Sequence, residues 1–421
     1  MTGKKIKIMT LSDHPLSPSG VGTQTRYIIE GMLKTGKYEF ISLGGAIKHD
    51  QYNPSKTEEY GDQWLIFPVD GYGTQDQVRS MIWKYKPDIL WFMTDPRFWG
   101  WLWDMDNEIR AQMPMIYYHV WDNFPAPEFN TPRYRSNDHI ACISKVTHSI
   151  IQELTPDITN SYVPHAVDGD IFVPIPEDQV EKFHDEHFPD DKFGEKVVFF
   201  WSNRNARRKQ SGTLIWWFKE FLEEVGHDKA RLIMHTEPKD VHGQDLLQIA
   251  AHLGLDNREV IFSTKKLPLT ILPLFYSLAD CTINISDAEG FGLATLESLA
   301  CGTPIIVNMT GGLQEQVTDG EDTFGIGIEP ASKAIIGSQE VPYIYEDRIS
   351  KEDFIAAMKK IYDMTREERK ELGLRGRQHV LKSYNFDNYI QKWDEIFTDT
   401  YNTHGSWENR KGFKPYTFGE I

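Results

Sequence analysis

The sequence predicts an α/β protein made of two domains, each built around a parallel sheet. The chain has 421 residues, which is more than one ordinary hydrophobic core accommodates. Short apolar runs alternate with helix-length amphipathic segments, as expected for repeated strand–helix–strand units. This alternation is interrupted over residues 173–196 by a stretch rich in proline and charge, and then starts again. Two α/β domains joined by a linker are therefore expected.

The first domain is expected over residues 1–175. Within it, Thr23–Leu33 has the apolar spacing of a helix. The predicted strands are Lys5–Leu11, Glu39–Leu43, Asp88–Met93, Met115–Val120 and Ile140–Ser144. A strand on each side of the helix favours a parallel pair with a helical crossover.

The second domain is expected over residues 190–383. Its predicted helices are Leu214–Glu224, Leu293–Ala300 and Glu367–Ser383, and its predicted strands are Val197–Trp201, Arg231–His235, Val260–Ser263, Cys281–Ser286 and Pro304–Val307. Residues 384–421 form a third segment, with an amphipathic helix over Tyr384–Tyr401 and an irregular tail after it.

Charge and composition argue against several classes of protein. The formal net charge of −17 opposes binding to nucleic-acid phosphates or anionic lipid, so neither partner is indicated. The apolar run near the N-terminus is too short for a signal peptide, and no run reaches the roughly 20 apolar residues of a spanning helix. The three cysteines are far apart and lie in apolar runs, which favours free thiols in a reducing compartment. A cytoplasmic protein without membrane insertion is expected.

The candidate ligand site follows one strand of the second domain. After Cys281–Ser286 comes the loop Asp-Ala-Glu-Gly-Phe-Gly over residues 287–292, and a helix then starts at Leu293. Gly290 and Gly292 allow the backbone to approach a ligand closely. The unpaired N–H groups at the helix N-terminus carry partial positive charge, which suits a diphosphate.

Two carboxylates accompany this helix start. Glu297 lies on the second helical turn, and its side chain leans back toward the N-terminus. It can accept hydrogen bonds from vicinal hydroxyls, as on a ribose, and Glu289 in the loop can do the same for a sugar. The combination predicts a nucleotide-sugar site. Nowhere does the spacing of His, Cys and Asp suit a metal, so no metal ligand is predicted.

This region resembles glycosyltransferase family 4, the retaining transferases of GT-B fold. Glu289 and Glu297 form the E-x7-E pattern of that family, and the likeness covers most of the chain except residues 45–80 and those after about 400. Further matching residues are the glycine loop Ser19–Gln24, His119 in YYHVWD, residues 140–144 and 163–168, and the basic pair Arg204 and Lys209.

The resemblance implies two Rossmann-like domains that face a central cleft, with the C-terminal helix packing back on the N-terminal domain. It also implies transfer of a sugar, with retention, from a nucleotide-diphosphate sugar to a hydroxyl acceptor. No metal or other cofactor is implied, because the basic pair supplies the positive charge that the leaving diphosphate needs.

For the second domain, the resemblance implies that Arg204 and Lys209 neutralise the diphosphate. Arg208 adjoins Lys209, and either of them could point at the phosphate. Glu297 would hold the ribose. Glu289, together with backbone N–H groups of Phe291–Leu293, would hold the transferred sugar.

For the first domain, the resemblance implies that Gly20 and Gly22 close over the phosphates and that His119 contacts the sugar. The acceptor would bind in this domain, where aromatic residues gather. The candidate acceptor residues, in or near an expected loop, are Trp99, Trp101, Trp121 and Asp122. We expect a soluble acceptor with a free hydroxyl: a glycan, a small metabolite, a protein or a hydroxylated nucleobase.

Three other functions stay open at this point. An inverting GT-B transferase or a sugar-nucleotide epimerase would use His119 or Asp122 as its base. A non-catalytic protein that binds a sugar nucleotide or a glycan would not need both the basic pair and the two glutamates. A dinucleotide oxidoreductase is disfavoured, because the Gly20-x-Gly22 segment lacks the third glycine of that fingerprint and Glu39 begins the next strand.

Overall fold

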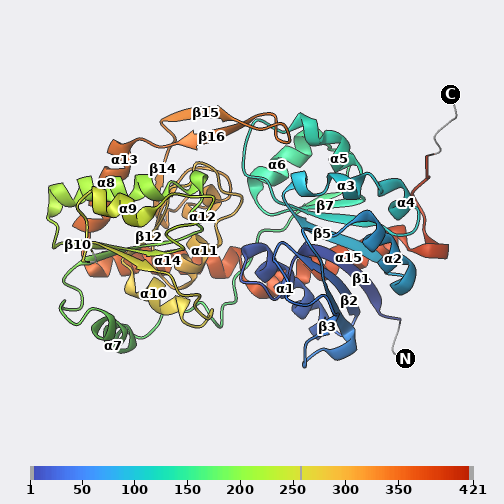
Figure 1. The fold of residues 1–421 in the computed structure, drawn as a ribbon, viewed down its shortest axis with the longest axis horizontal. Helices are drawn as coiled ribbons and strands as arrows, with labels where there is room; N and C mark the ends of the chain where they lie inside the picture. Colours follow the sequence, from blue (N-terminus) through green and yellow to red (C-terminus); the bar gives the residue numbers. More distant parts are fainter. Residues whose placement is uncertain (1–3, 257, 417–421) are drawn as a thin grey trace. The chain divides into compact units, whose positions relative to one another are not determined.

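The computed structural model describes residues 4–256 and 258–416. The chain divides into two compact units, which are drawn in Figure 1. Among the described residues, unit 1 comprises those up to His165, Gln339–Val341 and those from Asp387 onward, and unit 2 comprises Ala166–Ser338 and Pro342–Phe386. The sequence-based boundaries at 175 and 384 lie ten and three residues from the divisions after His165 and before Asp387. Residues 1–3 and 417–421 of the expected domains are outside the described part.

Unit 1 is built on a sheet for which eight strands are described. In spatial order they are β3 (Ser55–Lys56), β4 (Trp64–Pro68), β2 (Tyr38–Gly45), β1 (Ile6–Asp13), β5 (Ile89–Thr94), β6 (Met115–His119), β7 (His139–Cys142) and β8 (Asn160–Tyr162). All neighbours are parallel except β3 and β4. Strand β1 lies inside the sheet, as a doubly wound fold requires.

Helices cover both faces of this sheet. They are α1 (Gly20–Lys34), α2 (Gln75–Tyr85), α3 (Gly100–Trp103), α4 (Asp106–Arg110), α5 (Thr131–Arg135), α6 (Lys145–Leu154) and α15 (Phe386–His404). Successive residues of β5 point to opposite faces: Trp91 contacts Trp393 of α15, while Phe92 packs against Trp99. The buried face of α15 thus completes the core of unit 1, as the amphipathic pattern predicts.

Helix α15 is held to unit 1 by polar contacts as well. The hydroxyl of the buried Tyr38 donates to Asp394 Oδ1 at 2.7 Å, and Lys37 pairs with the same carboxylate. Gly31 of α1 lies against Ile390, where a β-carbon would come within 2.2 Å of the isoleucine side chain. The C-terminal helix therefore belongs to the N-terminal core, as expected for this fold.

Unit 2 contains a fully parallel sheet with six described strands. In spatial order they are β11 (Val260–Ser263), β10 (Ala230–His235), β9 (Val197–Ser202), β12 (Cys281–Asn284), β13 (Ile305–Asn308) and β14 (Gly325–Ile328). Strands β9 and β12 are neighbours, so the loops that follow them emerge side by side at the carboxyl edge.

Two groups of helices cover the sheet of unit 2. Helices α8 (Ser211–Val225), α9 (Leu246–His252) and α13 (Lys351–Asp363) pack on one face, and α7 (Glu177–His187), α10 (Leu272–Leu278), α11 (Leu293–Ala300) and α14 (Arg366–Ser383) pack on the other (Figure 1). The short α12 (Leu313–Val317) follows β13, and β15 (Ser332–Ile336) pairs with β16 (Ile344–Arg348) in an antiparallel hairpin.

The sequence-based elements largely agree with the structure, and three differences stand out. The expected linker contains helix α7, whose glutamates and histidines give it the appearance of a charged loop. The hairpin of β15 and β16 was not expected, because only one of its ten strand residues, Glu346, is buried. The expected loop around Trp99 is a 3-10 turn, Pro96–Phe98, followed by α3. No described helix is long and apolar enough to cross a bilayer.

Candidate functional site

The loop between β12 and α11 has a backbone shape that depends on glycine. Gly292, the N-cap of α11, has φ of 92°, in the left-handed region that side chains disfavour. A β-carbon there would also lie 2.5 Å from the Leu313 side chain. Gln316 of α12 donates to the carbonyls of Phe291 at 2.6 Å and Gly292 at 3.1 Å. The loop is thus held in one conformation before any ligand arrives.

A second glycine supports this loop from the strand next to it. Gly312, in the turn after β13, donates its N–H to the carbonyl of Glu289 at 3.1 Å. A β-carbon on Gly312 would lie 2.6 Å from the α-carbon of Phe291 and 2.7 Å from the carbonyl of Gly290. These contacts are with backbone, which cannot move aside without moving the whole loop.

Lys209 and Glu289 meet in the middle of the site. Lys209 ends the 3-10 turn Arg207–Lys209 after β9, and its ammonium donates a hydrogen bond to Glu289 Oε2. Asn284, at the end of β12, donates to the same oxygen at 3.2 Å. Both members of the ion pair are buried. Neighbouring parallel strands therefore place a cation and an anion, distant in sequence, against one another.

The protonation state of Glu289 follows from these neighbours. Burial alone would raise the pKa of its carboxyl, but the charges of Lys209 and Arg208, with the hydrogen bonds from Lys209 and Asn284, lower that pKa to about 2. Arg208 lies 3.9 Å from Glu289 Oε1 and donates to the carbonyl of Ala288. At neutral pH Glu289 is ionised, so it accepts hydrogen bonds and has no proton to donate.

The other basic residues of this segment point elsewhere. Arg204, predicted as the partner of Lys209, instead forms a two-bond ion pair with Asp240, at 2.7 and 3.1 Å. Arg207 pairs in the same way with Glu346 on β16, at 2.5 and 3.0 Å. The structure therefore brings Lys209 and Arg208 to Glu289 and leaves Arg204 outside that cluster.

Glu297 lies on α11 at the predicted position, in the second turn of the helix. The hydroxyl of Tyr276, on α10, donates to Glu297 Oε2 at 2.6 Å. Burial raises the pKa of Glu297 to about 7, an effect that the hydrogen bond from Tyr276 partly opposes. Glu289 and Glu297 thus differ sharply in acidity: one is fully ionised at neutral pH and the other is half protonated.

In unit 1, the predicted glycine loop is the first turn of α1. Gly20 is the first residue of that helix, and the N-cap Ser19 accepts a hydrogen bond from the N–H of Gly22 at 3.0 Å. Ser19 in turn donates to the buried Asp13, at 2.6 Å. A β-carbon on Gly22 would lie 2.7 Å from the carbonyl of His14, so this glycine is required for packing.

His119 ends β6 as predicted, but its ring is completely buried. Its Nε2 is 3.0 Å from the hydroxyl of Tyr134, and its Nδ1 has no hydrogen-bond partner among the described residues. Burial lowers the pKa of His119 to about 3, so the ring is neutral. The structure does not support the alternative in which His119 is a general base, since a ligand could reach this ring only after its neighbours move.

The predicted acceptor residues are placed differently from the expectation. Trp99 is fully buried in the core between Phe92 and Tyr72, and Trp121 is buried with its ring N–H bound to the carbonyl of Asn123 at 2.7 Å. The prediction that these two rings stack on a ligand is wrong, because their faces are covered by protein. Trp101 and Asp122 are partly exposed and stay candidates.

Several residues of the site escaped the sequence analysis. Tyr276, Asn284, Gln316 and Gly312 contact the glutamates or their loop from other elements, and Asp240 binds Arg204. Only Gly312 carried a local signal, as the second residue of a Gly-Gly pair after a strand. The other four are ordinary polar residues whose proximity depends on the folded sheet. Within the described residues there is no group of three His, Cys, Asp or Glu side chains that could hold a metal ion.

Comparison with known sequences finds relatives for the segment of the chain that contains this site. A family model described as "Glycosyl transferases group 1" matches residues 183–379, a segment that contains the β9 and β12 loops and α11. A D-inositol 3-phosphate glycosyltransferase of Acidothermus cellulolyticus is 42% identical over 100 residues, which are 24% of this chain and 21% of the relative. A GDP-mannose-dependent alpha-(1-6)-phosphatidylinositol monomannoside mannosyltransferase of Mycolicibacterium smegmatis is 28% identical over 192 residues, or 44% of this chain and 47% of the relative. The chain thus spans less than half the length of these curated relatives.

Comparison with solved structures covers nearly the whole chain. The sucrose-phosphate synthase of Thermosynechococcus elongatus superposes with a TM-score of 0.73 at 15% identity, covering 95% of this chain and 100% of that one. Anabaena HepE in complex with UDP and glucose superposes with a TM-score of 0.68 at 14% identity, covering 94% and 100%. The fold is therefore the GT-B fold of glycosyltransferases, with two Rossmann-like domains.

Proposed function

We propose that this protein is a retaining glycosyltransferase that moves a sugar from a nucleotide-diphosphate sugar to a hydroxyl acceptor. The observation that carries the proposal is the buried Lys209–Glu289 pair beside the N-terminus of α11. The ammonium and the free N–H groups of the helix place positive charge where a diphosphate leaving group develops negative charge. The ionised Glu289 is suited to bind the hydroxyls of the transferred sugar. A relative of the same fold has been solved in complex with UDP and glucose, which agrees with a nucleoside diphosphate and a sugar as the ligands proposed here.

The acceptor in this proposal is a soluble molecule with a free hydroxyl. The relatives named for D-inositol 3-phosphate suggest a polyol phosphate as the first acceptor to test. The three buried free cysteines are consistent with action in the cytoplasm. We propose that transfer requires no metal, with Lys209 supplying the charge that a divalent cation supplies elsewhere. Full activity in excess chelator is expected, and complete loss of activity would contradict the proposal that transfer requires no metal.

A donor screen tests the proposal directly. UDP-, GDP- and ADP-sugars are incubated with the protein, with and without inositol phosphate, and release of the nucleoside diphosphate is measured. Slow hydrolysis of one donor class, accelerated by an acceptor, is expected. Proton NMR of the early product then reports its anomeric configuration; inversion would exclude the retaining reaction, and no release from any donor would exclude the transferase.

Donor affinity should depend on the protonation of Glu297. Because its pKa is about 7, the carboxylate that accepts both ribose hydroxyls is lost as the pH falls, and affinity should decrease by up to about tenfold per pH unit below 7. Calorimetric titration of a nucleotide sugar from pH 5.5 to 8.5 measures this. Glu297→Gln should bind weakly at every pH with a flat profile, and identical profiles for the two proteins would contradict the assignment.

Arg204 offers a separate test, since it can reach a phosphate only by leaving Asp240. If Arg204 binds the donor diphosphate, Asp240→Asn releases it from a competing carboxylate and should raise donor affinity about threefold. The matched control is Arg204→Ala in the same background, which should remove the gain. Unchanged affinity in Asp240→Asn would leave Lys209 and Arg208 as the diphosphate ligands.

A further inference from the structure

Unit 2 contains a second pocket, at the edge of the sheet opposite to the donor loop. Its volume is about 200 Å³, which suits a small molecule. Its lining includes Asp280 just before β12, Thr303 and Pro304 just before β13, and Arg231 near the start of β10. In a parallel sheet the amino ends of all strands share one edge, so this pocket is separate from the site at the carboxyl ends of β9 and β12.

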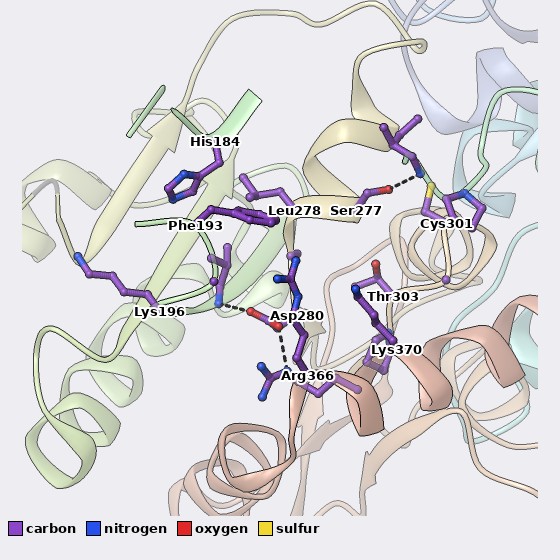
Figure 2. Close-up of a pocket in the computed structure, with 18 of the residues that line it drawn as sticks. His184, Phe193, Lys196, Ser277, Leu278, Asp280, Cys301, Thr303, Arg366 and Lys370 are labelled. Carbon is purple, nitrogen blue, oxygen red and sulfur yellow. Dashed lines mark hydrogen bonds and ion pairs between the residues drawn. The ribbon is translucent and has the colours of Figure 1, made fainter. Parts of the chain in front are cut away.

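The pocket is basic, although the protein as a whole is acidic. The cations that line it are Lys192, Lys196, Arg231, Arg366, Arg369 and Lys370. Two carboxylates of the lining pair with these cations. Asp191 forms ion pairs with both Lys196 and Arg231, and Asp280 forms an ion pair with Arg369 at 2.9 Å. Figure 2 shows Asp280 near the middle of these side chains, with Lys196 and Lys370 on opposite sides in this view.

Helix α7 supplies the third carboxylate. Glu177, at the start of α7, pairs with both Arg366 and Lys370, at 3.0 and 2.9 Å. Among the described residues, five of the six cations of the lining therefore form ion pairs with three carboxylates, Asp191, Asp280 and Glu177. The exposed Lys370 and the partly exposed Arg366 can exchange Glu177 for an anion at little cost, because exposed ion pairs are weak.

The remaining wall is apolar. It includes Pro174, Leu278 and Leu374, and the ring of Phe193 lies under the Arg366 guanidinium at 4.5 Å. A guanidinium stacked on a ring keeps its edge free to donate hydrogen bonds in the ring plane. Basic groups on one side and carbon on the other favour a ligand with an anionic head and an apolar body.

We propose that this pocket is a second ligand site, which binds a small phosphomonoester with an apolar body and so adjusts donor binding. Arg366 and Lys370 would hold the phosphate as charged donors. Phe193, Leu278 and Leu374 would cover the body. The site is distinct from the proposed donor site in its residues, its sheet edge and its ligand.

Two short elements connect the pocket to the donor site. Helix α10 contributes Leu278 to the pocket wall, and its Tyr276 donates to Glu297. Thr303, also in the wall, donates to the carbonyl of Tyr276 at 2.6 Å. Helix α11 starts at the donor loop, carries Glu297 and ends beside the pocket. A ligand that shifts Leu278 or Thr303 therefore acts on the residue that orients Glu297.

Binding is tested on the full chain by calorimetry, with phenyl phosphate as the probe and with inorganic phosphate and phenol as its two halves. Phenyl phosphate should bind more tightly than either half. Arg366→Gln combined with Lys370→Gln should weaken it about tenfold or more, whereas Glu177→Gln should strengthen it about threefold by releasing both cations. Lys382→Gln, on the same helix but outside the pocket lining, is the matched control and should bind normally.

Opposite effects of the two sets of variants cannot arise from a general loss of folding. The proposed site would be wrong if phenyl phosphate did not bind. It would also be wrong if the wild type and the Arg366/Lys370 double variant bound it equally. If inorganic phosphate bound as tightly as phenyl phosphate, the proposal that the ligand has an apolar body would be wrong. None of these measurements needs a nucleotide sugar, so their outcome does not depend on whether the protein is the proposed transferase.

The effect on donor binding rests on the proposed function and has its own measurement. The affinity for the donor found in the screen is compared with and without saturating phenyl phosphate. We expect a change of at least about fivefold in either direction, lost in the Arg366/Lys370 double variant. Equal affinities in the wild type would overturn the regulatory role, while the binding measurements above would still decide the site itself.

Discussion

Lys209→Ala is expected to lower kcat/KM for sugar transfer by about 10²–10³-fold, the usual cost of removing one group that stabilises developing charge. Lys209 is the buried cation closest to the donor loop, and it also compensates the charge of Glu289. Without it, the pKa of Glu289 rises because the attraction that lowered it is gone. Steady-state kinetics with the donor from the screen measures the loss.

The control is Arg207→Ala, two residues earlier in the same turn. Arg207 is as basic as its neighbours but is bound to Glu346, away from Glu289. We expect less than about a threefold change in kcat/KM for this variant. If Arg207→Ala and Lys209→Ala lose activity equally, the turn acts as a diffuse basic surface and the specific role of Lys209 is wrong.

Gly312→Ala is expected to weaken donor binding by at least about tenfold while the protein stays folded. The backbone of Gly312 has φ of −73°, which alanine adopts freely, so the substitution causes no conformational strain. Its β-carbon, however, would lie 2.6 Å from the backbone of Phe291 and force the donor loop outward. The N–H groups at the start of α11 would then miss the diphosphate. Calorimetry with a nucleoside diphosphate measures the loss.

Gly169→Ala is the control for this experiment, because nothing lies within 4 Å of a β-carbon at that position. It should leave both donor affinity and thermal unfolding unchanged. Circular dichroism of Gly312→Ala should retain the helix content of the wild type. Normal donor binding by a folded Gly312→Ala protein would show that the loop does not need its observed position.

The two glutamates illustrate what each level of structure contributes to chemistry. Their spacing places one in a loop and the other on the following helix, whatever surrounds them. Their acidities differ because the charges of Lys209 and Arg208 lower the pKa of Glu289, whereas burial raises the pKa of Glu297 and the hydroxyl of Tyr276 opposes this only in part. These partners come from the 3-10 turn after β9 and from α10, both distant in sequence, so no local pattern could have predicted a pKa near 2 for one carboxyl and near 7 for the other.

The tryptophans show a case in which the sequence suggested a ligand site that tertiary packing covers. Aromatic residues in a polar stretch resembled a ligand platform, yet Trp99 is enclosed by Phe92 and Tyr72. A large ring buries more apolar surface than any other side chain, and its burial is decided by which helix packs over it. The sequence showed that the rings exist, and only the tertiary packing showed that Trp99 and Trp121, two of the four acceptor candidates, are inaccessible.

By itself, the sequence determined the α/β class, most strand positions, helix α11 to the residue, and the glutamates on either side of its start. These features depend on local periodicity, glycine conformation and helix geometry, which neighbouring residues specify. Tertiary structure alone decided that Lys209 and not Arg204 meets Glu289, that Gly312 supports the donor loop, and that six cations surround a pocket at the far sheet edge. Those outcomes depend on which strands are neighbours, and strand order joins residues as distant as Lys209 and Glu289, which are 80 positions apart.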